Sequence, residues 1–184
     1  MTDLAPLRIG VTGSRRYGSP AVIRAAFLAA HERARPHDGH VLIHGQCDPV
    51  HPDTGRRIPW AAAKRVSWEV QRRFLGGDWL AEQVALDMDM RWEFKRHPAD
   101  WRPGGRFDRA AGFKRNADMV ASGADEWIAL ALPCSDHRCY RSDPHPSHGT
   151  AHCAKLAAEA GIPVCPYGPD GADESMLAAT LDGW

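Results

Sequence analysis

Short apolar runs alternate with longer amphipathic segments along the first part of the chain. Residues 7–11 and 41–43 are mostly apolar and rich in β-branched side chains, and a glycine follows closely after each run. Between them, residues 21–35 repeat apolar side chains at the spacing of one helical face, and the preceding Ser19-Pro20 is typical of a helix start. The pattern predicts a buried strand, a helix and a second buried strand.

The alternation continues to residue 165. Residues 92–95 alternate like a third strand, residues 110–122 and about 149–160 have helical periodicity, and residues 127–132 and 162–165 are short apolar strands. Five strands separated by helices predict an α/β fold with a mainly parallel, doubly wound sheet. The 184 residues suit a single domain of this kind.

Two segments depart from this alternation. Residues 49–77 begin with turn-forming residues, and positions 56–75 carry six basic residues and one glutamate. We interpret residues 49–77 as a basic insertion that contains a helix over 61–75, after which Asp78 caps a further helix. Residues 167–184 are acidic and are interpreted as a tail.

The composition weighs against several classes of protein. The chain has 23 Lys and Arg residues and 23 Asp and Glu residues, so its formal net charge is zero and nucleic-acid binding is not expected. No apolar run approaches the roughly 20 residues of a membrane span, and the first residues do not resemble a secretory signal. We therefore expect a cytoplasmic protein without a membrane partner. Five cysteines, an odd number, favour free thiols or a metal site over disulfides.

Polar and glycine-bearing segments follow the predicted strands. Ligands of doubly wound sheets bind beyond the carboxyl ends of the strands, so we expect these segments to converge. Gly13, Ser14 and Arg15 offer backbone N–H groups, a hydroxyl and a guanidinium that suit a phosphate, although a tight turn without a ligand is the alternative. The other expected binding residues are His44, Gly45, Asp78, Arg115, Asn116, Ser147, Gly149 and Thr150, of which the last three could form a second anion cradle at a helix N-terminus.

Residues that commonly bind metal are concentrated between positions 134 and 153. Three of the five cysteines and four of the ten histidines occur there. Zinc prefers four such ligands in a tetrahedral shell, and Cys134, His137, Cys139 and His145 could enclose one ion. The spacing lacks paired Cys-x-x-Cys motifs, so an ordinary polar loop is the alternative. A structural zinc is the only cofactor that the sequence suggests.

Six short motifs occur in order along the chain. They are Val-Thr-Gly-Ser-Arg (11–15), Ile-His-Gly (43–45), Gly-Asp-Trp-Leu-Ala (77–81), Arg-His-Pro-Ala-Asp-Trp (96–101), Ala-Ala-Gly-Phe-Lys-Arg-Asn (110–116) and Ser-His-Gly-Thr-Ala-His-Cys (147–153). In combination they resemble the YspA-like branch of the SLOG superfamily, which is widespread in bacteria and actinobacterial phages. The resemblance covers roughly residues 7–165 apart from the insertion. It implies a Rossmann-like domain that senses or sequesters a nucleotide-derived ligand, such as ADP-ribose or a cyclic relative, in phage defence or counter-defence. By analogy it also implies a homodimer.

A sister branch, the LOG-type phosphoribohydrolases, suggests the main alternative, N-glycosidic hydrolysis of a nucleotide. Its signature is Pro-Gly-Gly-x-Gly-Thr-x-x-Glu, and here Gly149-Thr150 match while Cys153 stands at the position of the catalytic Glu. A thiol does not readily replace a carboxylate at an oxocarbenium-like centre, although a helix N-terminus could lower its pKa. The departure favours binding over hydrolysis. A hydrolase would need another carboxylate, for which Asp78 and Asp100 are the candidates.

Two further interpretations stay open. Related SLOG proteins occur in DNA uptake, so the basic insertion at 49–77 could contact DNA, although the net charge of zero weighs against this role. The domain could also retain the fold with a degenerate pocket. In the second case the cleft would bind no nucleotide.

Overall fold

Six strands form one sheet in the computed structural model, which describes residues 4–137, 139, 141 and 145–175. In chain order they are β1 (Leu7–Gly13), β2 (His40–His44), β3 (Trp92–Arg96), β4 (Glu126–Leu130), β5 (Val164–Gly168) and β6 (Gly171–Ala172). Their order across the sheet is β3-β2-β1-β4-β5-β6; the first five strands are parallel and β6 pairs antiparallel with β5. This is the Rossmann-like arrangement, so the predicted α/β doubly wound class is confirmed.

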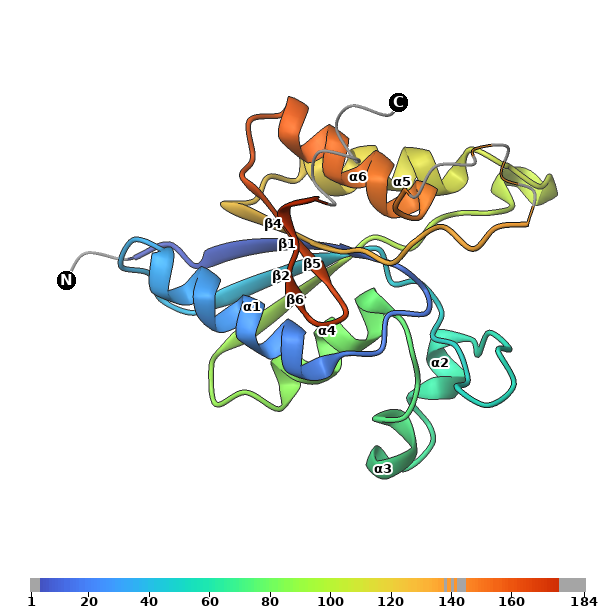
Figure 1. Cartoon of the computed structure of the whole chain (residues 1–184), viewed down its shortest axis with the longest axis horizontal. Coiled ribbons are helices and arrows are strands. Elements are labelled where there is room, and N and C mark those ends of the chain that lie inside the picture. Colours follow the sequence, from blue (N-terminus) through green and yellow to red (C-terminus); the bar gives the residue numbers. More distant parts are fainter. Residues whose placement is uncertain (1–3, 138, 140, 142–144, 176–184) are drawn as a thin grey trace.

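Four helices cover the two faces of the sheet (Figure 1). The helices α1 (Pro20–Arg33) and α4 (Gly77–Leu86) pack on one face, and α5 (Ala111–Ala121) and α6 (His148–Glu159) pack on the other. The chain extends from β1 to β2 and β3 on one side and then crosses β1 to continue with β4. The switch point therefore lies between β1 and β4, where doubly wound domains form their ligand crevice.

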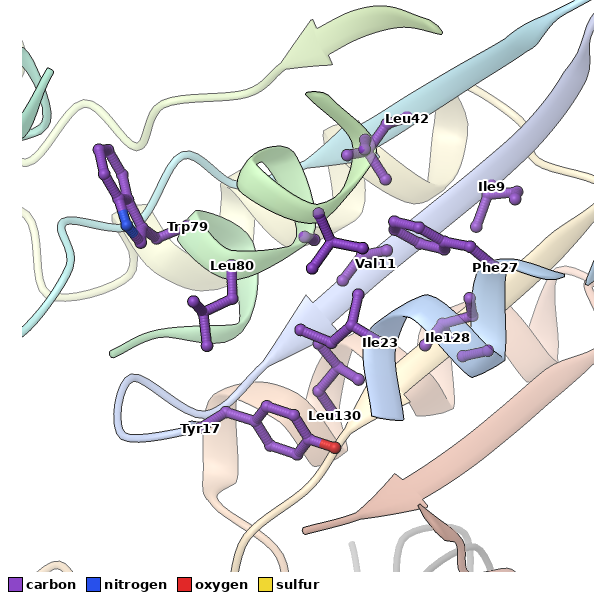
Figure 2. Close-up of a cluster of buried hydrophobic side chains, with 14 of the residues drawn as sticks. Ile9, Val11, Tyr17, Ile23, Phe27, Leu42, Trp79, Leu80, Ile128 and Leu130 are labelled. Atoms are coloured by element: carbon purple, nitrogen blue, oxygen red, sulfur yellow. The ribbon is translucent and has the colours of Figure 1, made fainter. Parts of the chain in front are cut away.

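Side chains of the strands point alternately to the two faces of the sheet and contribute to two separate apolar cores. Ile9 and Val11 of β1 and Ile128 of β4 pack against α1 and α4, where Phe27 and Leu80 also contribute (Figure 2). On the other face, a core that includes Ile43, Trp127 and Cys153 lies against α5 and α6. Successive strand residues point to opposite faces, so nearly continuous apolar runs are needed to supply both cores.

The insertion is folded into the first core, and it differs from the single helix predicted over 61–75. Two short helices occur instead, α2 (Trp60–Ala63) and α3 (Trp68–Gln71). A single helix would align Ala63, Val66, Val70 and Phe74 on one apolar face, but only Ala63 and Phe74 are buried in the core. A straight helix would separate these two positions by about 16 Å along its axis, and the break allows both to reach one core.

Two other boundaries also differ from the predictions. Gly76, with φ 135°, precedes α4, and the helix begins at Gly77, so Asp78 lies in the first turn and is not its cap. The predicted acidic tail starts within the sheet, because β5 extends to Gly168 and β6 follows. Residues 176–184 of that tail lie outside the described residues. No helix in the described part of the chain has the length and apolar character of a membrane span.

Candidate functional site

Two adjoining cavities lie beyond the carboxyl ends of the central strands, each with a volume of about 260 Å³. They share Arg15, Cys47, Trp101 and Arg115, so they are two chambers of one cleft. The first chamber lies at the switch point, between the segment after β1 and the first turns of α4, α5 and α6. Its lining residues are Thr12, Gly13, Ser14, Arg15, Cys47, Asp78, Trp101, Arg109, Gly112, Phe113, Arg115, Asn116, Met119, Ser147, Gly149 and Thr150.

The structure brings together most of the binding residues expected from the sequence. Nine of them line the first chamber, namely Gly13, Ser14, Arg15, Asp78, Arg115, Asn116, Ser147, Gly149 and Thr150. Gly45 lines the second chamber, and His44 lines neither. The residues converge because parallel strands end at the same edge of the sheet. Their contact with a ligand stays a prediction.

The segment after β1 packs tightly against the start of α4. A Cβ atom on Gly13 would lie 2.7 Å from the Cα of Gly77, which leaves no room for a side chain at either position. The Ser14 N–H donates to the Leu130 carbonyl at 3.0 Å, and the Gly77 N–H donates to the Ser14 carbonyl at 3.0 Å. The Ser14 amide is therefore engaged in the fold and not directed at a phosphate as we expected. The Ser14 hydroxyl and the exposed Arg15 supply the donors on this side of the chamber.

The N-terminus of α6 forms another part of the same chamber. Ser147 precedes the helix, and its hydroxyl lies 2.8 Å from the Thr150 hydroxyl. The first N–H groups of an α-helix have no acceptor within the helix, and its dipole favours an anion there. Asn116 fixes this end of α6 against α5, because its amide nitrogen donates to the Gly149 carbonyl at 3.2 Å. The arrangement suits a phosphate, as the sequence suggested.

Arg115 is a largely buried cation that joins the segment after β2 to α5. Its side chain is 13% exposed, and Nη1 donates to the Gly45 carbonyl at 2.5 Å. Nη1 and Nη2 each contact the Cys47 sulfur at 3.5 Å, while Nε donates to the Asn116 side-chain oxygen at 3.0 Å. Burial opposes the charge, but nearby Cys47 and Asp78 raise the pKa of Arg115 above its ordinary value. The guanidinium both lines the cleft and holds its walls together.

The two candidate catalytic carboxylates have different surroundings. Asp78 is buried at the cleft, where its Oδ2 accepts the Cys47 N–H at 3.0 Å and lies 3.9 Å from Arg115 Nη1. Asp100 lies outside both chambers, is exposed, and accepts the Arg102 N–H at 3.0 Å. The structure therefore does not bring Asp100 to the cleft: Asp100 holds a turn, while its neighbour Trp101 lines the cleft.

His44 is a buried core residue with hydrogen-bond partners, and the structure does not bring it to the cleft. Its side chain is fully buried, with Nε2 3.1 Å from a Glu82 carboxylate oxygen. Its Nδ1 accepts the Gln46 N–H at 3.2 Å, so the neutral ring carries its proton on Nε2 and donates to Glu82. Lys64 Nζ and Arg96 Nε also lie 2.8 Å from Glu82. Burial alone would raise the pKa of Glu82, but hydrogen bonds from His44, Arg96 and Lys64 hold it well below its ordinary value.

Comparison with known proteins places the chain beside a phage protein. The Gene 61 protein of Mycobacterium phage D29 is 40% identical over 161 residues, which cover 88% of this chain and 96% of that protein. The chain belongs to the family of this phage protein. No protein-family model and no solved structure matches the chain.

In this member of the Gene 61 protein family, Cys153 lies beneath the cleft and does not line it. The thiol is fully buried among the apolar residues between the sheet and α6. Burial raises the pKa of Cys153 to about 12, while a hydrogen bond with Thr12 acts in the opposite direction. Our expectation of a lowered pKa is therefore wrong, because loss of solvent outweighs any favourable effect of the helix N-terminus. Burial likewise raises the pKa of Cys47 above its ordinary value, and neither thiol is an activated nucleophile.

A cluster of metal-ligand types does form beside α6, with one change from the predicted set. Ligand atoms of Cys134, Cys139, His145 and His148 all lie within 4.8 Å of one another, so they could hold a metal ion. His137 is not part of the cluster, since its side chain is 89% exposed. The Cys134 N–H donates to the His145 carbonyl at 2.8 Å, and this pairing brings the two ends of the segment together. His148 completes the cluster because it is the first residue of α6.

Sequence reasoning missed three groups that line the cleft. Trp101 and Phe113 are 38% and 43% exposed in the first chamber, and Arg109 lies beside them. Both aromatic residues occur within the SLOG-like motifs, and this position was the signal in the sequence that could have indicated their role in the cleft. Arg57 and Trp60 line the second chamber. They belong to the insertion, so this segment contributes to the cleft, a role that composition alone did not indicate.

Proposed function

We propose that the cleft binds a nucleotide-derived ligand of the ADP-ribose class, cyclic relatives included, and that the protein senses or sequesters this ligand. One observation supports the proposal most directly. A single chamber is lined by three arginines, the N-terminus of α6 and two exposed aromatic side chains. Arginines and helix N-termini favour phosphate, and aromatic faces favour a planar base.

The aromatic side chains account for the base. Trp101 is stacked with Phe107, with ring centroids 6.2 Å apart and an angle of 13° between the planes. Gly112 lies against Trp101, and a Cβ atom there would be 3.3 Å from the indole ring. Large exposed rings at a concave surface are typical of binding sites. We assign the adenine to the surface formed by Trp101 and Phe113.

The two chambers account for the size of the ligand. Small-molecule sites usually enclose about 300–1,000 Å³, so one chamber of about 260 Å³ is small and the two together fall within the range. Arg15 and Arg115 line both chambers. A diphosphate at this boundary would leave an adenosine in one chamber and a ribose in the other. That division matches the chemistry of ADP-ribose better than that of a mononucleotide.

The surroundings of the thiols and carboxylates favour binding over hydrolysis. Cys153 is covered by core residues, Asp100 lies outside the cleft, and Asp78 is already engaged by the Cys47 N–H. An N-glycosidic hydrolase would use Asp78, because it is the only carboxylate among the described residues that line the first chamber. We also propose that the chain belongs to the SLOG superfamily.

A thermal-shift series with ADP-ribose, cyclic ADP-ribose, NAD and AMP tests the proposal. At 100 times its Kd, a ligand adds about 2.7 kcal/mol of stability, which raises Tm by roughly 5–11 °C for a domain of this size. Arg15→Ala should weaken binding of the best ligand about 10- to 100-fold, since it removes charge-assisted hydrogen bonds. Arg16→Ala is the matched control, because Arg16 is exposed and lines neither chamber.

Two results would contradict the binding proposal. If none of the four compounds raises Tm at millimolar concentration, the cleft does not bind this class of ligand. If liquid chromatography detects released base that Asp78→Asn abolishes, the protein is a hydrolase. Equal loss of affinity in Arg15→Ala and Arg16→Ala would remove Arg15 from the site.

We also propose that Cys134, Cys139, His145 and His148 bind a structural zinc ion. With zinc–ligand bonds of about 2.0–2.3 Å, the ligand atoms of a tetrahedral site lie about 3.3–3.7 Å apart. The Cys139 sulfur lies 3.4 Å from His145 Nε2 and 3.3 Å from His148 Nε2, and these two nitrogens are 3.3 Å apart. An ion there would fasten the segment before α6 to the N-terminus of that helix.

The test compares two histidine variants. Elemental analysis should show that His148→Gln lowers the zinc content by one equivalent, while His137→Gln keeps the wild-type content. Equal zinc in both variants would exclude His148 as a ligand, and loss of zinc in His137→Gln alone would restore the set that the sequence suggested.

A further inference from the structure

Three histidines converge at the edge of the sheet opposite the cleft. His31 is in the last turn of α1, His37 is in the connection that follows, and His40 begins β2. His31 Nδ1 lies 3.0 Å from His37 Nε2 and 3.1 Å from His40 Nε2, and the last two atoms are 3.3 Å apart. The carboxyl end of β2 leads to the cleft, so His40 at its start places this cluster far from it.

The rings point their nitrogens at a common position. Ring centroids are 4.8–5.2 Å apart, although the facing nitrogens are only 3.0–3.3 Å apart. The planes of His37 make angles of 85° and 77° with those of His31 and His40. Rings that pack by stacking would bring their faces together, whereas these three bring their edges together.

With neutral rings, the three facing nitrogens carry too few protons to form hydrogen bonds with one another. A bound cation would remove this mismatch. His37 Nδ1 lies 2.8 Å from the Arg35 carbonyl, and His40 Nδ1 lies 3.3 Å from the Arg91 carbonyl. A carbonyl only accepts, so both rings donate from Nδ1, and in their neutral forms each Nε2 carries a lone pair. These lone pairs face one another at 3.3 Å. The single proton that His31 Nδ1 can provide satisfies only one of them.

We infer that His31 Nδ1, His37 Nε2 and His40 Nε2 bind one divalent transition-metal ion, with zinc as the expected occupant. With zinc–nitrogen bonds of about 2.0–2.1 Å, the observed separations correspond to N–Zn–N angles of roughly 90–110°, close to tetrahedral geometry. Imidazole ligands suit zinc, copper and nickel. The bonds from Nδ1 to the Arg35 and Arg91 carbonyls are the outer contacts that orient metal-bound histidines.

This site differs in kind from the cysteine-containing cluster beside α6. Three protein ligands leave a fourth position for water or an external ligand, whereas a four-ligand site is closed. Burial decreases from His40, which is buried, to His31, which is exposed, so solvent reaches the cluster. The ion would join the end of α1 to the start of β2 and would stabilise the native state.

Metal titration of the tag-free, chelator-treated full chain tests the inference. Cobalt serves as the spectroscopic probe, because a histidine site gives visible ligand-field bands without the thiolate charge-transfer band of a cysteine site. His37→Gln should lose the part of the ligand-field absorption that belongs to this site and bind one equivalent of zinc at least 100-fold more weakly, while a cysteine site would keep its charge-transfer band and its own ligand-field absorption. His31→Gln, at an exposed position, is a second variant that is expected to fold. His137→Gln, which belongs to neither cluster, should titrate as wild type.

Nitrogen-15 imidazole spectra identify the coordinating atoms. Zinc should shift the signals of His31 Nδ1, His37 Nε2 and His40 Nε2, while the Nδ1 atoms of His37 and His40 stay protonated. The inference is wrong if zinc moves none of these signals, or if His31→Gln and His37→Gln bind zinc with the stoichiometry and affinity of wild type.

Discussion

Replacement of Gly45 by alanine tests how the cleft is held together. A Cβ atom at this position would lie 1.6 Å from Arg115 Nη1 and 2.3 Å from its Cζ, far closer than any real contact. The guanidinium would have to leave its position, which breaks the hydrogen bond to the Gly45 carbonyl and the contacts with Cys47 and Asp78. Gly45→Ala therefore acts on Arg115 more than on the backbone at residue 45.

The magnitude follows from the interactions that are lost. A hydrogen bond from a charged group contributes about 1.5–3 kcal/mol, and separating a buried ion pair costs at most about 3–5 kcal/mol. Because the Cys47 N–H still compensates Asp78, we expect Gly45→Ala to lower the free energy of unfolding by about 2–4 kcal/mol. For a chain of this length, that corresponds to a Tm about 5–15 °C lower.

Urea unfolding followed by tryptophan fluorescence provides the measurement. Gly149→Ala is the matched control, because nothing lies within 4 Å of a Cβ atom there, and its effect should stay within about 0.5 kcal/mol. In an Arg115→Ala background, Gly45→Ala should cost far less, since the clash is gone. An equal cost of Gly45→Ala in both backgrounds, or a neutral effect in the wild type, would show that Arg115 does not depend on the glycine.

Two further predictions concern buried titratable groups. Glu82→Gln should destabilise the protein by about 1–3 kcal/mol at neutral pH, because it removes the buried charge that accepts hydrogen bonds from Lys64 and Arg96, whose side chains are 32% and 39% exposed. The pKa of Glu82 is lowered by folding, so its contribution is full above the unfolded value of about 4.3 and is lost as the pH falls toward the folded value. Urea unfolding at pH 7 and pH 4 should show a smaller difference from wild type at pH 4, and a constant difference would contradict this. The Cys153 thiol should resist iodoacetamide at pH 8 in the native protein and react in urea, as mass spectrometry would show; rapid native labelling would contradict its burial and raised pKa.

Much of the fold follows from local patterns in the chain. Apolar runs such as 7–11 and 41–43 are too continuous for a half-exposed strand, and the segments between them have helical periodicity. The continuous apolar runs indicate strands that are buried on both faces, and the helical periodicity indicates helices that cover them. Because parallel strands end at one edge, the chain order alone also brought Gly13, Arg15 and Arg115 to one cleft.

The tertiary structure decided which side chains face that cleft. His44 shares the α4 side of β2 with Leu42, since alternate strand residues point the same way, and it meets Glu82 there. No sequence pattern shows that the Glu82 carboxylate on α4 lies at that end of the strand. The same holds for the metal ligands, because a backbone pairing between Cys134 and His145 and the start of α6 select His148 over His137. Periodicity specifies elements because it is local, whereas a site depends on contacts between residues far apart in the chain.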